Sequence, residues 1–180
     1  MAAGADHLRD RIPAMIRARR AAGVVVLLLG LVGCAGDSSE ASAANELTWQ
    51  DAKARTQAME MEIADSIPED KVAKVDQGAT GLLFNCSDSS VNWKGATTVT
   101  LNAGTEPEPL VREVEAKYQD SRFDIETRTA PAGHYEVGLV SPDTAEIYLI
   151  AAGWDPYTIR IASGSECFPW PEGEYMGGDF

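Results

Sequence analysis

The sequence predicts an α+β domain in which an antiparallel sheet of about six strands carries two helices on one face. Three observations lead to this class. Two segments have the helical spacing of apolar residues, and six short segments are rich in β-branched and aromatic residues. The last four strand segments follow one another across short turns, which antiparallel strands allow and parallel strands do not. The predicted order is therefore α-β-β-α-β-β-β-β, with both helices packed on the same face.

The first helix is predicted to begin after Thr48 and to end before Pro68. Thr48-Trp49-Gln50-Asp51 is close to a capping box, with Asp where Glu is usual. Apolar or small residues then recur at steps of three and four, namely Trp49, Ala52, Thr56, Met59 and Ile63. We expect this stripe to pack on the sheet, with docking against a partner helix as the alternative.

Two strands and the second helix follow. Lys71 to Gly78 is predicted to be a polar connection, and Gly81 to Cys86 and Thr97 to Leu101 are predicted to be strands. Residues 87–95, which include Trp93, are predicted to be the loop between them. The second helix is predicted to start at residues 105–109, where acidic residues and Pro suit a first turn. It ends near Asp120 and turns one face inward: Leu110, Val111, Val114 and Tyr118.

Four strands complete the predicted sheet. Their expected core faces are Phe123, Ile125 and Thr127; Tyr135, Val137 and Leu139; Ile147, Leu149 and Ala151; and Tyr157, Ile159 and Ile161. Keeping these sets on one face requires an odd-length loop around residues 142–144. With three residues in the turn at Pro131, Arg128 falls opposite Glu136 on the outer face.

The first 33 residues are predicted to be an export signal. A basic cluster ending at Arg20 precedes an uncharged run over residues 21–36, which is short for a spanning helix. A positive start, a short apolar run and small residues at its end are typical of a signal peptide. Met15 is an alternative start. Arg19-Arg20 also suits twin-arginine export, but the rest of that motif is missing and we prefer general secretory export.

Leu31-Val32-Gly33-Cys34 closes the apolar run and resembles the lipobox of bacterial lipoproteins. The resemblance implies cleavage after Gly33 and lipidation of Cys34, and two or more acyl chains give a stable anchor. A stray or buried Cys is the alternative. The predicted organisation is a signal peptide at 1–33, a flexible linker at 34–45 and a single domain at 46–180. The implied location is the cell membrane, lipid-anchored and facing outside the cytoplasm.

The charge of the processed chain limits its partners. Residues 34–180 contain ten Lys and Arg and 26 Asp and Glu, a net charge of about −16. Such a chain is not expected to bind nucleic acid through phosphates, and anionic lipid headgroups repel it. Solubility above the membrane is the simpler account of the charge. Attraction of a cationic partner is the other.

Two cysteines remain after the predicted lipidation site. Outside the cytoplasm, Cys86 and Cys167 are expected to form a disulfide that closes a loop of 82 residues, from 86 to 167 inclusive. Two free thiols are the alternative, but no Cys-x-x-Cys motif supports a reactive cysteine.

We find no motif that names a reaction. His134 is the only histidine after the signal, and one imidazole does not make a zinc site. The Gly-x-Ser-x-Gly elbow and the P-loop are absent from the sequence. The many acids could include a glycosidase pair, but no pattern marks one out. We therefore predict no enzyme activity, metal or cofactor.

Loop aromatics are the candidate binding residues. A bond between Cys86 and Cys167 would bring the loop that holds Trp93 close to the tail that holds Trp170. A possible binding patch is therefore Trp93, Trp154, Tyr157, Phe168 and Trp170. The alternative is that these rings cap the open end of the core.

The whole chain resembles the small exported lipoproteins of actinobacteria, a group that supplies no activity. The Ala- and Arg-rich leader, the lipobox, the acidic domain and Ser165-Glu166-Cys167-Phe168 carry this resemblance. The predicted function is a non-catalytic binding or interaction module of the cell envelope, with an envelope protein or ligand as partner. One alternative is an inhibitor of a cationic hydrolase, such as a lysozyme-like enzyme. The other is an envelope hydrolase with unrecognised carboxylates.

Overall fold

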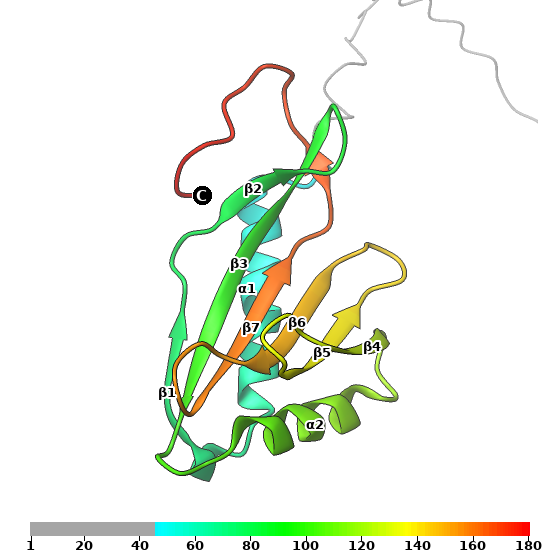
Figure 1. The fold of residues 1–180 in the computed structure, drawn as a ribbon. Coiled ribbons are helices and arrows are strands. Elements are labelled where there is room, and N and C mark those ends of the chain that lie inside the picture. Colours follow the sequence, from blue (N-terminus) through cyan, green and yellow to red (C-terminus); the bar gives the residue numbers. More distant parts are fainter. Residues whose placement is uncertain (1–45) are drawn as a thin grey trace, which may run out of the picture. The chain divides into compact units, whose positions relative to one another are not determined.

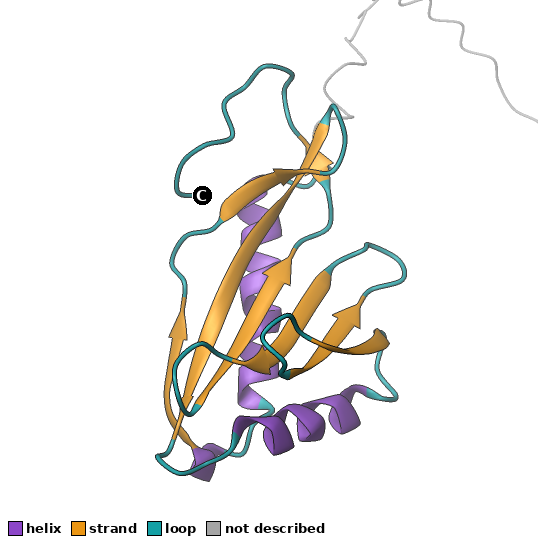
Figure 2. Ribbon diagram, in the orientation of Figure 1, coloured by secondary structure: helices purple, strands orange, loops and turns teal. Residues whose placement is uncertain are grey.

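The structure is a computed structural model that describes residues 46–180, so the predicted signal, the linker, Gly33 and Cys34 lie outside the described residues. The described chain forms two α-helices and an eight-stranded antiparallel sheet, which confirms the α+β class (Figures 1 and 2). Two hydrophobic cores, described below, and the two cysteines of the disulfide all lie within this segment. Residues 46–180 therefore contain the packing that holds the domain together. Between residues 46 and 180, no helix is both long and apolar enough to cross a bilayer.

The elements follow the predicted order with additions. The helices are α1 (Trp49–Asp65) and α2 (Pro107–Tyr118), and a short 3-10 turn, η2, spans Glu69–Lys71. The strands are β1 (Val72–Gln77), β2 (Leu82–Asn85), β3 (Ser90–Leu101), β4 (Asp124–Thr129), β5 (Tyr135–Val140), β6 (Ile147–Ala152), β7 (Thr158–Gly164) and β8 (Phe168–Pro169).

The twelve-residue strand β3 is the spine of the sheet. The main strand order is β1-β3-β7-β6-β5-β4, and β2 and β8 pair with the first part of β3. On one side β3 pairs first with β2 and then with β1, and on the other it pairs with β8 and then with β7. In Figure 1, α1 lies behind this sheet and α2 crosses its lower end.

Both helices begin and pack as their sequences predict. The Thr48 hydroxyl accepts a hydrogen bond from the Asp51 amide at 3.2 Å, which caps α1. Four of the five residues in the predicted stripe of α1 are buried, and so is the whole predicted face of α2: Ala52, Thr56, Met59 and Ile63; Leu110, Val111, Val114 and Tyr118. These faces share one hydrophobic core with the inner face of the sheet, so both helices cover the same side.

A second, smaller core lies where β2, β3 and β8 meet. It consists of Ala52, Leu83, Val91, Trp93 and Phe168. The tail beyond β8 returns to close it. The Phe180 ring packs edge-on against Trp49 and Trp170, with centroids 5.6 and 5.8 Å away, and its backbone pairs with Gly81.

Two predictions for residues 71–95 are wrong. The segment predicted as a polar connection at 71–78 contains β1, an irregular edge strand whose exposed residues hide the alternation. Residues 90–95, predicted as loop, begin β3 and point Trp93 inward. Gly95 permits this placement, because a Cβ there would come within 2.1 Å of the Trp93 ring.

The disulfide between Cys86 and Cys167 is present. Cys86 follows β2 and Cys167 precedes β8, and these two strands flank the first part of β3. The pairing is the one that the sequence predicts, and the structure shows that the bond joins the two sides of the second core.

The predicted core face of β6 is also wrong. Six residues connect β5 to β6, and the Ser141 amide bonds the Glu146 carbonyl, which leaves a four-residue turn from Pro142 to Ala145. Ala145 in this turn adopts a left-handed φ of 58°. This even-length turn pairs Val137 with Ile150 and Leu139 with Tyr148. Tyr148 and Ile150 therefore enter the core, and the expected set of Ile147, Leu149 and Ala151 lies on the outer face.

One carboxyl group is fully buried between α1 and the sheet. Glu60 is 0% exposed and accepts hydrogen bonds from the Thr97 hydroxyl at 2.7 Å, the Gln77 amide at 3.2 Å and the Ser163 hydroxyl. Within residues 46–180 no Lys, Arg or His forms an ion pair with it. Hydroxyl and amide donors therefore satisfy this side chain in place of a cation.

Candidate functional site

The structure divides the predicted aromatic patch between two places. Trp93 and Phe168 are 0% and 1% exposed and belong to the second core, and Trp170 packs half-buried against them. Trp154 and Tyr157 lie in the β6–β7 loop and are 87% and 41% exposed. The core-capping alternative therefore describes Trp93, Phe168 and Trp170. Only Trp154 and Tyr157 remain as candidates for binding at the surface.

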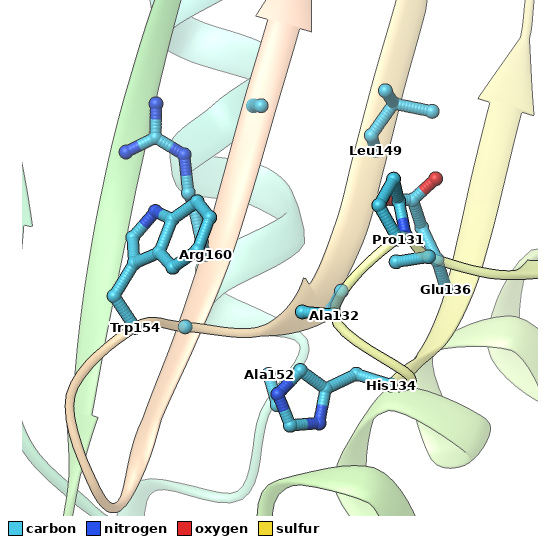
Figure 3. A pocket seen from close by; sticks show the side chains of 12 residues that line it. Pro131, Ala132, His134, Glu136, Leu149, Ala152, Trp154 and Arg160 are labelled. Atoms are coloured by element: carbon cyan, nitrogen blue, oxygen red, sulfur yellow. The ribbon is translucent and has the colours of Figure 1, made fainter.

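Trp154 stands beside a hollow on the outer face of the sheet, which we call the sheet-face groove. The groove has a volume of about 270 Å³. Its floor comes from β6 and β7, and its rim comes from the β4–β5 and β6–β7 loops. Figure 3 shows Trp154 and Arg160 at one side and Pro131, Leu149 and Glu136 at the other.

Short side chains make this part of the outer face hollow. Ala151 on β6 and Ala162 on β7 lie on the floor with Leu149. The turn that sends Tyr148 into the core is what places Leu149 and Ala151 here. Pro131 and Ala132 rise above the floor from a tight turn, where Gly133 has a φ of 87° and the Ala130 amide bonds the His134 carbonyl at 2.8 Å.

The loop that carries Trp154 is braced by its own hydrogen bonds. The Gly153 amide donates to the Thr158 carbonyl at 2.8 Å, and the Thr158 hydroxyl donates to the Asp155 carbonyl at 2.6 Å. Tyr157 has a left-handed φ of 57°, and its carbonyl accepts from the Leu101 amide at 2.7 Å. A non-glycine residue in this conformation needs its surroundings to hold it there. Trp154 is thus presented on a restrained loop.

Of the charged side chains that line the groove, Glu136 forms an ion pair within residues 46–180 and Arg160 does not. Glu136 is its single carboxylate, and the Arg128 guanidinium binds it at 2.5 Å across the β4–β5 pair, as the predicted register requires. Arg160 lies opposite Thr98 and Ala151, so neither neighbouring strand places an acid beside it. The exposed His134 imidazole completes the polar lining.

A second cavity, the acidic hollow, lies on the far side of Trp154 and has a volume of about 430 Å³. It shares His134, Gly153 and Trp154 with the groove and extends to the start of α2. Its carboxylates come from Glu106, Glu108 and Asp155, and Glu108 is bound to Arg112 at 2.8 Å. Trp154 therefore stands between an apolar surface with a guanidinium and a surface rich in carboxylates.

A third cavity, the aromatic hollow, lies at the other end of the domain. It has a volume of about 320 Å³ and is lined by Leu47, Trp49, Trp170 and their neighbours. In Figure 1 this end of α1 lies near β2 and β8, whereas the β6–β7 loop lies toward α2. The aromatic hollow is thus next to the point where the described chain begins, and the sheet-face groove is remote from it.

The groove has the features of a binding site. A largely apolar concave surface with a few polar groups is the usual form of a small-molecule site, and an exposed Trp is a common anchor of recognition. Its one carboxylate is ion-paired, so the lining itself does not offer the two acids of a glycosidase. Among residues 46–180 no three His, Cys, Asp or Glu side chains gather closely enough to hold a metal ion.

Sequence reasoning located only part of this site. It selected Trp154 and Tyr157, but it missed Arg160 and the alanine floor. The small residues of β6 and β7 carry no chemical signal of their own, and only the register of β6 shows which of them face outward. No protein-family model, curated protein or solved structure matches the chain. What the domain binds therefore has to be inferred from its side chains.

Proposed function

We propose that this protein is a lipid-anchored module of the cell envelope that binds a ligand in the sheet-face groove. The observation that carries the binding function is Trp154, which is 87% exposed on a hydrogen-bonded loop at the rim of an apolar hollow. Leaving an indole in water is unfavourable unless a partner covers it, and a restrained loop reduces the entropy that binding costs.

The anchor and the groove suit each other. The described chain enters α1 at the end that holds the aromatic hollow, and the groove lies toward the other end (Figure 1). A linker on Cys34 that joins the domain near residue 46 would therefore leave the groove accessible. The net charge of about −16 repels such a domain from anionic headgroups. The lipid anchor alone would hold it at the membrane.

Retention of molecules from an envelope extract tests the binding function. The segment 45–180 is incubated with an extract of the producing bacterium, repurified and denatured, and the released compounds are identified by mass spectrometry. We expect a compound that the wild type and Tyr175→Ala retain and Trp154→Ala loses. Tyr175 is the matched control, because it is 82% exposed but lies outside the lining of the groove. Equal retention by Trp154→Ala, or none by the wild type, would contradict the proposal.

The anchor has a separate test. Cells that express the full chain are fed an alkyne-tagged fatty acid, and the protein is probed for the tag. We expect labelling of the wild type and of Cys86→Ser and none of Cys34→Ser. Labelling that survives Cys34→Ser would place the lipid elsewhere.

The acidic hollow favours a second candidate, an inhibitor of a cationic hydrolase. Glu106 and Asp155 line the same cavity as the exposed side chains of Trp154 and Tyr157. An aromatic anchor with carboxylates around it is a surface to which a basic enzyme would be attracted. This candidate predicts inhibition of lysozyme-like enzymes that weakens as salt rises and is lost in Trp154→Ala. An absence of inhibition across a panel of basic hydrolases, or inhibition that salt does not affect, would eliminate it.

A further inference from the structure

Among residues 46–180, Arg160 is the one arginine that forms no ion pair with another described residue. Residues 46–180 contain five arginines, and four of them bind a glutamate: Arg55 with Glu166, Arg112 with Glu108, Arg122 with Glu146 and Arg128 with Glu136. Arg160 has no carboxylate within 4.0 Å among these residues. Arg160 also lines the sheet-face groove, so its guanidinium is available to an anion that binds there.

The neighbours of Arg160 explain why it stays free. Its partners in the sheet are Thr98 on β3 and Ala151 on β6, and neither is charged. The Glu136 carboxylate across the groove is already bound by Arg128, and its side chain is only 12% exposed. The local charge available to a ligand in the groove is therefore positive. A guanidinium matches a carboxylate through two parallel N–H···O bonds.

The rest of the lining selects the body of the ligand. Leu149, Ala151 and Ala162 form an apolar floor, and Pro131 and Trp154 stand at its sides. The volume of about 270 Å³ limits the occupant to a small molecule. A flat or slender apolar body would cover the alanines and lie beside the indole ring.

We infer that the sheet-face groove takes a small organic carboxylate, with its carboxylate on Arg160 and its apolar body on the alanine floor beside Trp154. This inference rests on the proposed binding function and names the chemical class of the ligand. Small cations do not belong to this class, because the one carboxylate that lines the groove is already bound by Arg128. The carboxylates that could attract a cation line the acidic hollow instead.

Three matched probes test the class of ligand: 4-phenylbutyrate, 4-phenylbutanol and 4-phenylbutylamine. Each is titrated into ¹⁵N-labelled segment 45–180, and binding is followed at the indole N–H of Trp154 and the Nε–H of Arg160. We expect 4-phenylbutyrate to shift both signals and to bind at least about fivefold more tightly than the alcohol, as an exposed bidentate pair allows. We expect the amine to bind more weakly than the alcohol.

Two variants of equal charge make the test specific. In Arg160→Gln we expect the alcohol and the carboxylate to bind equally, whereas Arg55→Gln, which removes one positive charge on α1, keeps the fivefold preference. A preference that survives Arg160→Gln, or an amine that binds as well as the acid, would overturn the ligand class and leave the groove as a binding site. If none of the probes shifts the Trp154 indole at millimolar concentration, the ligand class and the proposed site both fail.

Discussion

Replacement of Glu60 tests how the buried interior of this domain is satisfied. The Glu60 carboxylate is 0% exposed and accepts from three donors, two of which are the buried hydroxyls of Thr97 and Ser163. Glu60→Met fills nearly the same volume but removes both acceptor oxygens. The two hydroxyls are then left without their partner inside the protein.

The cost follows from the two hydroxyls. A buried donor left unsatisfied costs about 1–3 kcal/mol, so Glu60→Met should lower the free energy of unfolding by about 2–5 kcal/mol. Glu60→Gln keeps one acceptor oxygen and should cost about 1–2 kcal/mol. Glu113 on α2 is exposed and makes no side-chain hydrogen bond or ion pair within residues 46–180, so Glu113→Met should change stability by less than about 0.5 kcal/mol.

Urea unfolding of segment 45–180, followed by far-UV circular dichroism with the disulfide intact, measures these differences. The expected order of stability is wild type and Glu113→Met, then Glu60→Gln, then Glu60→Met. If Glu60→Met is as stable as the wild type, the hydrogen bonds to Glu60 do not contribute to stability. A buried carboxyl without a cation would then be a net cost that apolar packing relieves.

Three further changes test the cores and the disulfide. Replacing Cys86 and Cys167 together with Ser releases the loop of 82 residues and should cost up to about 4.5 kcal/mol in the chain-entropy model; a loss below about 1 kcal/mol in urea unfolding would contradict that role. Trp93→Ala should lower the free energy of unfolding by about 3–5 kcal/mol, whereas Trp154→Ala should lower it by less than about 0.5 kcal/mol. Equal melting temperatures of the two variants would refute the assignment of Trp93 to a core. Burial raises the pKa of Tyr148, so its ionisation favours the unfolded chain, and the free energy of unfolding falls as pH rises above about 10, the usual pKa of tyrosine. Because its hydroxyl is buried without a partner among the described residues, Tyr148→Phe should gain about 1 kcal/mol at pH 7 and lose less stability above pH 10; a loss at pH 7 would show that the hydroxyl is bonded.

The parts of the fold that depend on short-range patterns were predictable from the sequence. Thr48 and Pro68 bound α1, and the stripes of α1 and α2 identify their buried faces. The register of β4 and β5, with Arg128 opposite Glu136, follows from a three-residue turn. These features are set by residues a few positions apart, which a sequence displays directly.

The errors arise where partners distant in sequence decide the structure. Trp93 sits among polar residues, and its burial depends on the space at Gly95 and on Phe168, far along the chain. In β6 both faces are apolar, so alternation alone does not choose between Tyr148 with Ile150 and Leu149 with Ala151. The four-residue turn decides, and it also creates the floor of the groove. For this reason the sequence located Trp154 but not the cavity beside it.

The most direct test of the central claim is to locate a bound ligand. Segment 45–180 is exposed to an envelope extract, repurified and crystallised, and the electron density is examined in each cavity. We predict ligand density in the sheet-face groove, between Trp154 and Pro131 and within bonding distance of Arg160. A groove that holds only water while the ligand occupies the aromatic hollow at Trp49 and Trp170 would contradict the account.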